Sequence, residues 1–483
     1  MSERKKAALH NLGCKVNSYE TEAMQELLEQ AGYEIVPFAP GADVYVINTC
    51  TVTNMADRKS RQMLHRAKKM NPDAVVVAAG CYVQAAAEEA AADEAIDIII
   101  GNNQKKDLVN ILENFRKGEK SKTECSCDGD CGDDCTCKEK PESQEAPAAE
   151  LASMSEEEFA ASVHETRKYL KDLTHQKEYE ELKITHTTEH TRAYIKVQDG
   201  CNQFCSYCII PYARGRVRSR ELADVLNEVK GLAESGFQEV VLTGIHLSSY
   251  GIDNGGSLLE LILKTMEVPG IRRVRLGSLE PRIITEEFVN ALKDQEKFCP
   301  HFHLSLQSGC DATLKRMNRR YTAEEYYEKC VLLRENFDHP ALTTDVIVGF
   351  PGETEEEFEA TKTFVADVRF YEMHVFKYSK RQGTRAAVME DQVSEQVKAR
   401  RSDVLLELEK TMSREYRERF AGSRVSVLFE EAAEIGGKWY MMGHTPQYVK
   451  AALPLEDGMN REEFGGRIME LFASGLLNDE ILK

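Results

Sequence analysis

Three closely spaced cysteines, Cys201, Cys205 and Cys208, are the feature that most constrains this chain. Their C-x3-C-x2-C spacing brings three thiolates to one inorganic core, but three ligands cannot saturate it. A 4Fe–4S cluster has four irons and is normally held by four cysteines, so this array leaves one iron open. An open position on a metal is where a substrate or cofactor binds. The array therefore predicts a reactive cluster rather than a purely structural one.

Zinc is the alternative for such an array. Structural zinc sites usually combine two paired units, such as C-x2-C with a second C-x2-C or H-x3-H. No second pair lies near residues 201–208 in the sequence, and the spacing therefore favours iron and sulfur.

Length and composition bound the class of protein. The chain has 483 residues, which predicts two to four domains of about 100–200 residues each. The longest apolar runs, including Ala74–Ala79 and Ile96–Ile100, fall far short of the roughly 20 residues that span a bilayer. Because the charged N-terminus leads into a short strand-like run, we expect no signal-peptide core there. We expect a cytoplasmic protein with no membrane partner, in which those of the 14 cysteines that occur in motifs serve metal binding or catalysis.

The net charge of −19 at first argues against a nucleic-acid partner. The acidic excess is concentrated between residues 119 and 181, however. A local basic patch elsewhere can still bind RNA, because affinity depends on the phosphates that are contacted.

Residues 1–116 alternate strand-like and helix-like segments, a pattern typical of a parallel sheet covered by helices. The expected strands are Lys6–Asn11, Asp43–Asn48, Ala74–Ala79 and Ile96–Ile100, with helices from about Ser18, Asn54 and Tyr82 and over Gln104–Phe115. Cys14, Cys50 and Cys81 each fall just after a strand. Because parallel strands end at one edge of a sheet, where ligands bind, these cysteines are predicted to converge on a second metal site. The alternative for each alone is a small buried apolar residue.

Residues 117–182 are acidic and poor in large aliphatic side chains. They contain Cys125, Cys127, Cys131, Cys135 and Cys137. We interpret them as an insertion between domains, with a helix from Ser155 to Leu170. The five thiols are compatible with a thiophilic ion and equally with a flexible acidic linker.

Residues 183–418 again alternate strands and helices. The expected strands are Ala193–Gln198, Glu239–Thr243, Arg272–Gly277, His301–Leu306, Thr343–Gly349 and Phe370–Tyr378. Six such units form a partial barrel whose active site lies at the strand C-termini.

Residues 419–483 contain short alternating strands, which predict a small β-barrel of the kind that binds single-stranded nucleic acid. The predicted fold class is therefore α/β with a small terminal β-barrel.

Three segments together resemble one family, the radical S-adenosylmethionine (AdoMet) methylthiotransferases. The cysteine trio of the first domain, the Cys201–Cys208 array and the terminal barrel, which resembles a TRAM domain, carry the resemblance. The sequences Asn11–Glu20 and Gly200–Arg220 are similar to the branch called MtaB. That branch modifies C2 of N6-threonylcarbamoyladenosine beside the anticodon of tRNA. The five-cysteine insertion departs from the family pattern.

The resemblance implies two 4Fe–4S clusters and AdoMet as cofactors. Cys201, Cys205 and Cys208 would hold the cluster that cleaves AdoMet to a 5′-deoxyadenosyl radical, which removes hydrogen from the adenine. Cys14, Cys50 and Cys81 would hold the cluster that delivers sulfur. The implied partners are tRNA, a low-potential electron donor such as flavodoxin or ferredoxin, and a sulfur source.

Other residues are expected to contact AdoMet or RNA. Side chains and turns at strand ends are expected to contact AdoMet: Gly244, Ser305, Gln307, Asp345, Gly349 and Gly352. The alternative for the glycines is an ordinary tight turn. A basic run beside the array is expected to contact RNA phosphates: Arg214, Arg216, Arg218 and Arg220. The alternative for such a run is a solvated face.

Three other functions stay open from the sequence. The same chemistry can act on isopentenyladenosine in tRNA, as in the MiaB branch, or on an aspartate of a ribosomal protein, as in the RimO branch. A different class is a non-catalytic iron–sulfur or metal-sensing protein built around the Cys125–Cys137 segment.

The two cysteine triads generate the first testable expectation. Replacing Cys201, Cys205 and Cys208 together with alanine should leave about half of the iron, because each triad binds one cluster of equal size. The same variant should not cleave AdoMet. Iron analysis and an assay for 5′-deoxyadenosine on anaerobically reconstituted protein check both points, and full iron content would contradict the ligand assignment.

Overall fold

The computed structural model describes residues 4–117, 166–187, 191–456 and 464–483. The chain divides into two compact units. The first unit contains residues 1–12, 24–49 and 58–171, and the second contains residues 13–23, 50–57 and 172–483. The cysteines of the predicted insertion, Cys125 to Cys137, lie outside the described residues.

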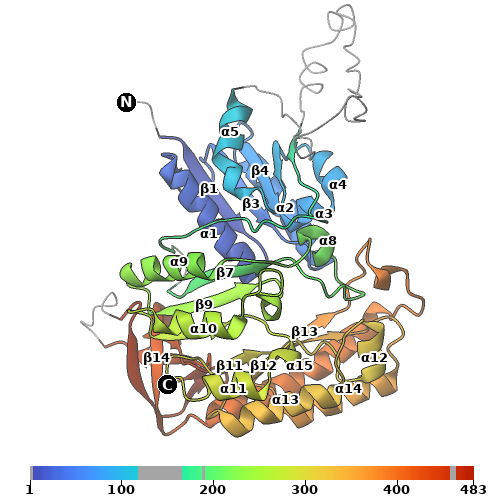
Figure 1. The fold of residues 1–483 in the computed structure, drawn as a ribbon, viewed down its shortest axis with the longest axis vertical. Helices are drawn as coiled ribbons and strands as arrows, with labels where there is room; N and C mark the ends of the chain where they lie inside the picture. The colour runs from blue at the N-terminus through green and yellow to red at the C-terminus, as the bar shows by residue number, and fades with distance from the viewer. Residues whose placement is uncertain (1–3, 118–165, 188–190, 457–463) are drawn as a thin grey trace, which may run out of the picture. The chain divides into compact units, whose positions relative to one another are not determined.

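The first unit is built on a parallel sheet of six strands in the order β2-β1-β3-β4-β5-β6. Figure 1 labels β1, β3 and β4 of this sheet. Its strands are β1 (Lys6–Asn11), β2 (Glu34–Ile35), β3 (Val44–Thr49), β4 (Val75–Gly80), β5 (Ile98–Ile100) and β6 (Arg167–Tyr169). The helices of this part of the chain are α1 (Lys15–Gln30), α2 (Asn54–Met70), α3 (Cys81–Ala85), α4 (Ala87–Ala91) and α5 (Leu108–Arg116), with a 3-10 turn at Lys105–Asp107.

Both faces of this sheet are buried, and the residues of β3 show how. Val44 and Val46 pack with Met24 and Leu28 of α1 and with α5 on one face. Tyr45 and Ile47 pack on the other face with Leu64 of α2 and with α3. Successive side chains of a strand point to opposite faces, so a strand covered on both sides is apolar throughout. This explains why the strands read as continuous apolar runs.

The parallel α/β organisation expected from the sequence is confirmed, with local differences. Helix α1 begins at Lys15, a turn earlier than predicted, and α3 begins at Cys81. Among the described residues of the expected Ser155–Leu170 helix, Arg167–Tyr169 instead form strand β6, which pairs with β5. That part of the helix prediction is wrong. A strand this short is stabilised by backbone pairing to its neighbour, which sequence periodicity does not reveal.

The second unit contains the six parallel strands expected for a partial barrel: β7 (Ala193–Asp199), β9 (Glu239–Gly244), β10 (Arg273–Leu276), β11 (His301–His303), β12 (Ala341–Val348) and β13 (Glu372–Lys377). They form two sheets, β10-β9-β7-β8 and β11-β12-β13. Parallel bridges at Val274–Phe298 and Leu279–Leu304 continue the curve between them. The short strand β8 (Arg218–Ser219) runs antiparallel to β7.

Helices connect and cover these strands (Figure 1). They are α8 (Ile210–Arg214), α9 (Leu222–Glu234), α10 (Leu258–Glu267), α11 (Glu286–Leu292), α12 (Asp311–Arg316), α13 (Ala323–Asn336), α14 (Glu355–Val368) and α15 (Glu395–Glu418). The 3-10 turns are Leu247–Ser249, Pro281–Ile283 and Arg385–Val388. Capping boxes start α13 at Thr322 with Glu325 and α14 at Thr354 with Glu357, which satisfies backbone N–H groups at the first turn.

The C-terminal part of the second unit is a β domain, as expected. Its strands are β14 (Ser423–Ile435), β15 (Lys438–His444), β16 (Lys450–Pro454), β17 (Ile468–Ala473), β18 (Leu476–Asn478) and β19 (Ile481–Leu482), in the order β17-β14-β15-β16-β19-β18. A two-residue turn at Gly436–Gly437 joins β14 to β15, and both glycines have positive φ. Such a turn matches the twist of a hairpin and favours glycine at both positions.

In the part of the chain that the structure describes, no helix is both long enough and apolar enough to span a bilayer.

Gly80, at the end of β4, generates a prediction about stability. Its φ is +97°, and a Cβ atom there would lie 2.5 Å from Asn48 Oδ1 and 2.8 Å from the Thr49 carbonyl oxygen. Gly80→Ala should therefore reduce the free energy of unfolding of the first unit by about 2–5 kcal/mol, because backbone strain and steric overlap add. Urea unfolding followed by circular dichroism measures this loss.

Gly32 provides a matched control in the same unit. Its φ is +86°, but nothing lies within 4 Å of the position that a Cβ atom would take there. Gly32→Ala should lose only the backbone part, about 1–2 kcal/mol. Equal losses in the two variants would show that the close approach at Gly80 carries no cost.

Candidate active site

Three cysteines follow the ends of three neighbouring parallel strands. The pairs Asn11–Asn48 and Thr49–Gly80 bring the C-terminal ends of β1, β3 and β4 to one edge of the sheet. Cys14 lies in the turn between β1 and α1, Cys50 follows β3 directly, and Cys81 begins α3 directly after β4. These positions are the ones that the sequence predicts, and this edge is where ligands of parallel sheets bind.

Cys50 and Cys81 are buried, whereas Cys14 is exposed. Gly13 has a φ of +112°, and a Cβ on it would lie 2.9 Å from Cys50 Sγ, so the turn that carries Cys14 runs against the Cys50 side chain. In the first unit, the Asn102 amide donates to Cys81 Sγ at 3.6 Å. Lys105 Nζ in turn donates to Asn102 Oδ1 at 2.7 Å. Hydrogen bonds of this kind orient a sulfur and stabilise its anionic form.

The loop that carries Cys201, Cys205 and Cys208 lies at the end of the first barrel strand, β7. Gly200 has a φ of +70°, and a Cβ there would lie 1.8 Å from the Arg216 carbonyl oxygen. The Cys201 backbone N–H donates to the Gly215 carbonyl at 3.0 Å. The start of the loop is thereby joined to its end, and only glycine fits at position 200.

The three thiols have environments suited to binding a metal cluster. Arg319 Nη1 lies 3.4 Å from Cys205 Sγ, and the Gln203 backbone N–H donates to Cys201 Sγ at 3.4 Å. Burial raises the pKa of the Cys201 thiol to about 11 and that of Cys208 to about 12. Cysteines bind metal as thiolates, so binding a cluster here would release protons. Three neighbouring thiols, two of which have N–H donors aimed at sulfur, fit an iron–sulfur cluster.

A buried ion-pair network connects the first turns of α1 with this loop, within the second unit. Arg214 donates from Nη1 to Glu20 Oε1 at 2.8 Å and from Nη2 to Asn17 Oδ1 at 2.7 Å. Lys196 Nζ lies 2.7 Å from both Glu20 Oε1 and Asp199 Oδ2. The side chains of all four charged residues are at most 1% exposed. We call Asn17, Glu20, Lys196, Asp199 and Arg214 the α1–loop network.

Charge complementarity keeps this network ionised. Burial alone would raise the pKa of Asp199, but Lys196, Arg214 and Arg218 outweigh it and hold the pKa well below the usual range. Burial would likewise lower the pKa of Lys196, but Asp199 and Glu20 raise it above its ordinary value. Removing one partner from such a set leaves an uncompensated buried charge.

The structure corrects the prediction of RNA contact for three of the four arginines beside the array. Arg214 and Arg218 are fully buried and Arg220 is 1% exposed. Arg214 and Arg218 pair with Asp199, and Arg220 pairs with Glu228. Arg216 alone among the four is exposed, with its guanidinium 4.6 Å from the centroid of the Phe204 ring. Buried arginines are not available to phosphates.

A cavity of about 210 Å³ lies beside the array, entirely within the second unit. Its lining includes Tyr207 from the array, Gln307, Asp345 and Ile347 from the barrel, and Val52–Thr53, which follow Cys50. Gln307 adopts a φ of +71°, unusual for a side chain of this size. Backbone bonds to Asp345 and Ile347 hold it there. Such strain is typical of sites where a side chain must be aimed.

The other predicted AdoMet residues lie near these strand ends with different contacts. A Cβ on Gly244 would lie 2.8 Å from Gln198 Oε1, and one on Gly349 would lie 2.2 Å from Lys398 Cγ, so close packing explains both glycines. A Cβ on Gly352 would overlap no neighbour, because its nearest atom, Arg316 Nε, would lie 3.5 Å away. The Ser305 carbonyl accepts from Arg319 Nη2 and the Tyr321 hydroxyl. AdoMet contact by these residues stays a prediction.

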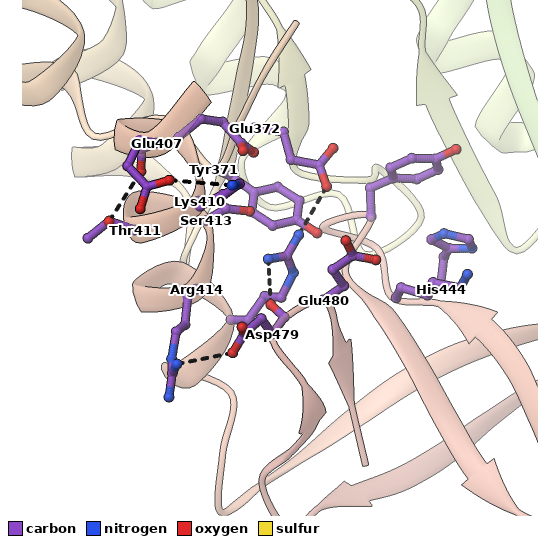
Figure 2. Close-up of a pocket in the computed structure, with 14 residues that line it drawn as sticks. Tyr371, Glu372, Glu407, Lys410, Thr411, Ser413, Arg414, His444, Asp479 and Glu480 are labelled. Atoms are coloured by element: carbon purple, nitrogen blue, oxygen red, sulfur yellow. Dashed lines mark hydrogen bonds and ion pairs between the residues drawn. The ribbon is translucent and has the colours of Figure 1, made fainter. Parts of the chain in front are cut away.

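A larger cavity of about 680 Å³ lies elsewhere, between α15, β13 and the terminal β domain (Figure 2). Charged side chains of both signs line it, and they pair across it. Arg414 Nη1 lies 3.0 Å from Asp479 Oδ1, and Arg417 Nη2 lies 3.4 Å from Glu372 Oε1. It contains no cysteine and no predicted site residue, so the smaller cavity is the better candidate for the reaction site.

The sequence of the chain is similar to those of known proteins. Models of the radical SAM superfamily and of uncharacterized protein family UPF0004 match residues 195–365 and 6–101. Threonylcarbamoyladenosine tRNA methylthiotransferase MtaB of Bacillus subtilis is 39% identical, over 92% of this chain and 89% of that protein. MtaB of Aquifex aeolicus is 37% identical, over 88% and 93% of the two chains. The chain belongs to the radical SAM methylthiotransferases.

Other relatives widen the comparison. The tRNA-2-methylthio-N6-dimethylallyladenosine synthase of Acetivibrio thermocellus is 34% identical, over 90% of this chain and 83% of that protein. The fold is similar to the radical AdoMet methyltransferase TsrM from Kitasatospora setae, with a TM-score of 0.53 over 80% of this chain and 74% of that one. Membership in the radical SAM methylthiotransferases implies AdoMet and a 4Fe–4S cluster as cofactors.

Several residues around the site escaped the sequence prediction. Asn102 follows β5 at the same sheet edge as the cysteines, and that position was the available signal. Arg319 lies in a basic cluster beside α12, where nothing in the sequence points to Cys205. Glu20 and Lys196 lie within regular elements, and only tertiary contact identifies them.

The α1–loop network generates the third prediction. Arg214→Gln should lower the free energy of unfolding by about 3–5 kcal/mol, because Glu20 and Asp199 lose a buried cation. Arg216→Gln, two residues away and exposed, should cost under about 1 kcal/mol, the value of an exposed cation–π contact. Urea unfolding and iron retention during gel filtration compare the two variants. Equal stabilities would show that the network does not hold the loop.

Proposed function

We propose that this chain adds a methylthio group to C2 of N6-threonylcarbamoyladenosine in tRNA. The observation that carries the proposal is the 210 Å³ cavity bounded by Tyr207 of the Cys201–Cys208 array and by Val52–Thr53 next to Cys50. One space thus borders segments of both cysteine sets. The relatives with 37–39% identity are named for this reaction on this nucleoside, which favours it over the other targets.

The cofactors would be held by residues of this chain in two places. Cys201, Cys205 and Cys208 would hold the cluster that binds AdoMet, and Cys14, Cys50 and Cys81 would hold a second 4Fe–4S cluster for the sulfur step. When bound there, AdoMet and its cluster would supply the radical chemistry needed at a C–H bond that is too weakly acidic for any protein base. Arg319 and the Gln203 N–H stabilise the thiolate ligands.

The protein's own contribution is to orient and enclose the reactants. Gln307 and Asp345 present polar groups to the cavity, whereas Ile347, Phe376 and Tyr378 provide an apolar wall suited to a flat base. A few polar groups in an apolar pocket fix the orientation of a ligand. Keeping water and other hydrogen donors out protects a radical until it reacts with its target.

Exposed groups beside the array are the proposed RNA contacts. Tyr212 is 55% exposed, and its ring lies 5.7 Å from that of Phe204, on which Arg216 stacks. An aromatic pair with one arginine suits base stacking and phosphate binding together. The terminal β domain is proposed as a second RNA contact. A low-potential donor such as flavodoxin or ferredoxin, and a separate sulfur source, complete the proposed partners.

Nucleoside analysis tests the function directly. A bacterial strain that lacks its own enzyme accumulates unmodified N6-threonylcarbamoyladenosine, and expression of this chain should restore the 2-methylthio form. Appearance of 2-methylthio-isopentenyladenosine alone would reassign the substrate. The absence of any methylthio nucleoside, with both clusters loaded, would contradict the proposal.

The fourth prediction concerns the separate functions proposed for the two cysteine triads, AdoMet cleavage and the sulfur step. Cys14→Ala should still cleave AdoMet to 5′-deoxyadenosine but should form no methylthio product, because radical generation needs only the Cys201–Cys208 cluster. Cys330→Ala serves as the control, since this buried cysteine lies in helix α13 and belongs to neither triad. Loss of AdoMet cleavage in Cys14→Ala with the first cluster intact would contradict the division.

A further inference from the structure

Three adjacent barrel strands bring two histidines and one carboxylate to the same face. The strand register pairs His303 of β11 with Thr343 of β12, and Asp345 of β12 with His374 of β13. Residues paired in a parallel sheet point to the same face, and positions two apart on a strand do so as well. Thr343, Asp345, His303 and His374 therefore share one face for reasons of backbone geometry alone.

The donor atoms of this set converge. One donor atom from each of His303, Asp345 and His374 lies within 4.8 Å of the other two. His303 Nε2 is 3.2 Å from Asp345 Oδ2, and the centroids of the two imidazole rings are 5.9 Å apart. Among the residues that the structure describes, this is the group of potential ligands that meets the spacing.

A neighbouring hydroxyl orients the first histidine. Thr343 Oγ1 lies 3.0 Å from His303 Nδ1, so the opposite nitrogen, Nε2, is directed toward Asp345. A ligating histidine commonly uses its second nitrogen in this way, which fixes the ring and its tautomer. If Nδ1 carries the proton, the lone pair of Nε2 and the carboxylate face each other, an arrangement that a cation between them stabilises.

We propose that His303, Asp345 and His374 bind a divalent first-row transition-metal ion, separate from the cluster iron. Two imidazoles and one carboxylate are a ligand set with open coordination positions, and imidazole suits ions such as Fe²⁺ and Zn²⁺. Asp345 also lines the 210 Å³ cavity, so an ion held here borders the space assigned to the reaction. The site itself does not depend on the proposed substrate.

Among the described residues, the ionisable side chain that pairs with the Asp345 carboxylate is His303, at 3.2 Å. The competing arrangement is a simple hydrogen-bonded His303–Asp345 pair, in which His374 lies close without a shared ion. The two arrangements differ in whether His374 affects metal binding.

Mn²⁺ is the probe of choice for full-length protein with both clusters loaded. It accepts imidazole and carboxylate, whereas the thiols of the chain prefer softer ions. Continuous-wave electron paramagnetic resonance measures bound and free Mn²⁺, and electron spin echo modulation detects imidazole nitrogen bound to it. We expect about one Mn²⁺ with nitrogen coupling. His374→Asn should weaken binding by more than about 100-fold, since even outer contacts contribute 10–100-fold.

Two further variants sharpen the test. Thr343→Val removes only the orienting hydroxyl and should weaken Mn²⁺ binding by about 10- to 100-fold. His65→Asn is the matched control, because His65 Nε2 also lies 2.9 Å from a carboxylate, Asp93 Oδ2, but His65 and Asp93 belong to no converging group among the described residues. His65→Asn should bind Mn²⁺ as the unaltered protein does.

The controls keep the result interpretable. Iron and sulfide content and the unfolding midpoint should be the same in all variants. His374 is exposed, so its replacement is compatible with folding, and Asp345→Asn provides a second route if it is not. Mn²⁺ binding that is equal in the unaltered protein and in both His374→Asn and Asp345→Asn, or bound Mn²⁺ without nitrogen coupling, would overturn the proposal.

Discussion

The buried contact between Arg214 and Glu20 is the interaction on which the arrangement of the site depends. Arg214 ends the helix that follows the Cys201–Cys208 array, and Glu20 lies in the helix that follows Cys14. Two bonds between guanidinium and carboxylate, at 2.8 and 3.0 Å, join these segments. Bidentate pairs of this kind fix direction as well as distance. A contact made of apolar side chains would allow more sliding between the two segments.

Lys196 and Asp199 extend this pair to the barrel strand that leads into the array. Burying four charges is costly, and it is tolerable only when each carries enough partners. In return, these ion pairs fix the position of the cysteine loop, which is held at its beginning by Asp199 and at its end by Arg214. Gly200 completes the arrangement by letting the two ends of the loop touch. A cluster held by three thiols requires this rigidity, because no fourth protein ligand corrects a misplaced one.

The same packing explains why a basic run beside the site is a poor guide to RNA binding here. Three of these arginines form ion pairs inside the protein: Arg214 with Glu20, Arg218 with Asp199, and Arg220 with Glu228. Tyr448, in the terminal β domain, shows the same effect. Its ring stacks on His301 and His444 at centroid distances of 5.1 and 4.6 Å. The sequence alone does not distinguish a charged or aromatic side chain that faces RNA from one that contacts an internal partner.

Local information in the sequence was sufficient for the fold class and for the positions of the cysteines relative to the strands. Continuous apolar strands between amphipathic helices specify a parallel sheet, and the positions of Cys14, Cys50 and Cys81 after strands follow from it. The spacing of Cys201, Cys205 and Cys208 is itself a chemical constraint, because nearby thiols on one loop reach one core. Tertiary structure alone decided which arginines are buried, that β6 completes the first sheet, and that His303, Asp345 and His374 share a face. These features depend on strand register and on contacts between residues far apart in the chain, for which sequence periodicity carries no signal.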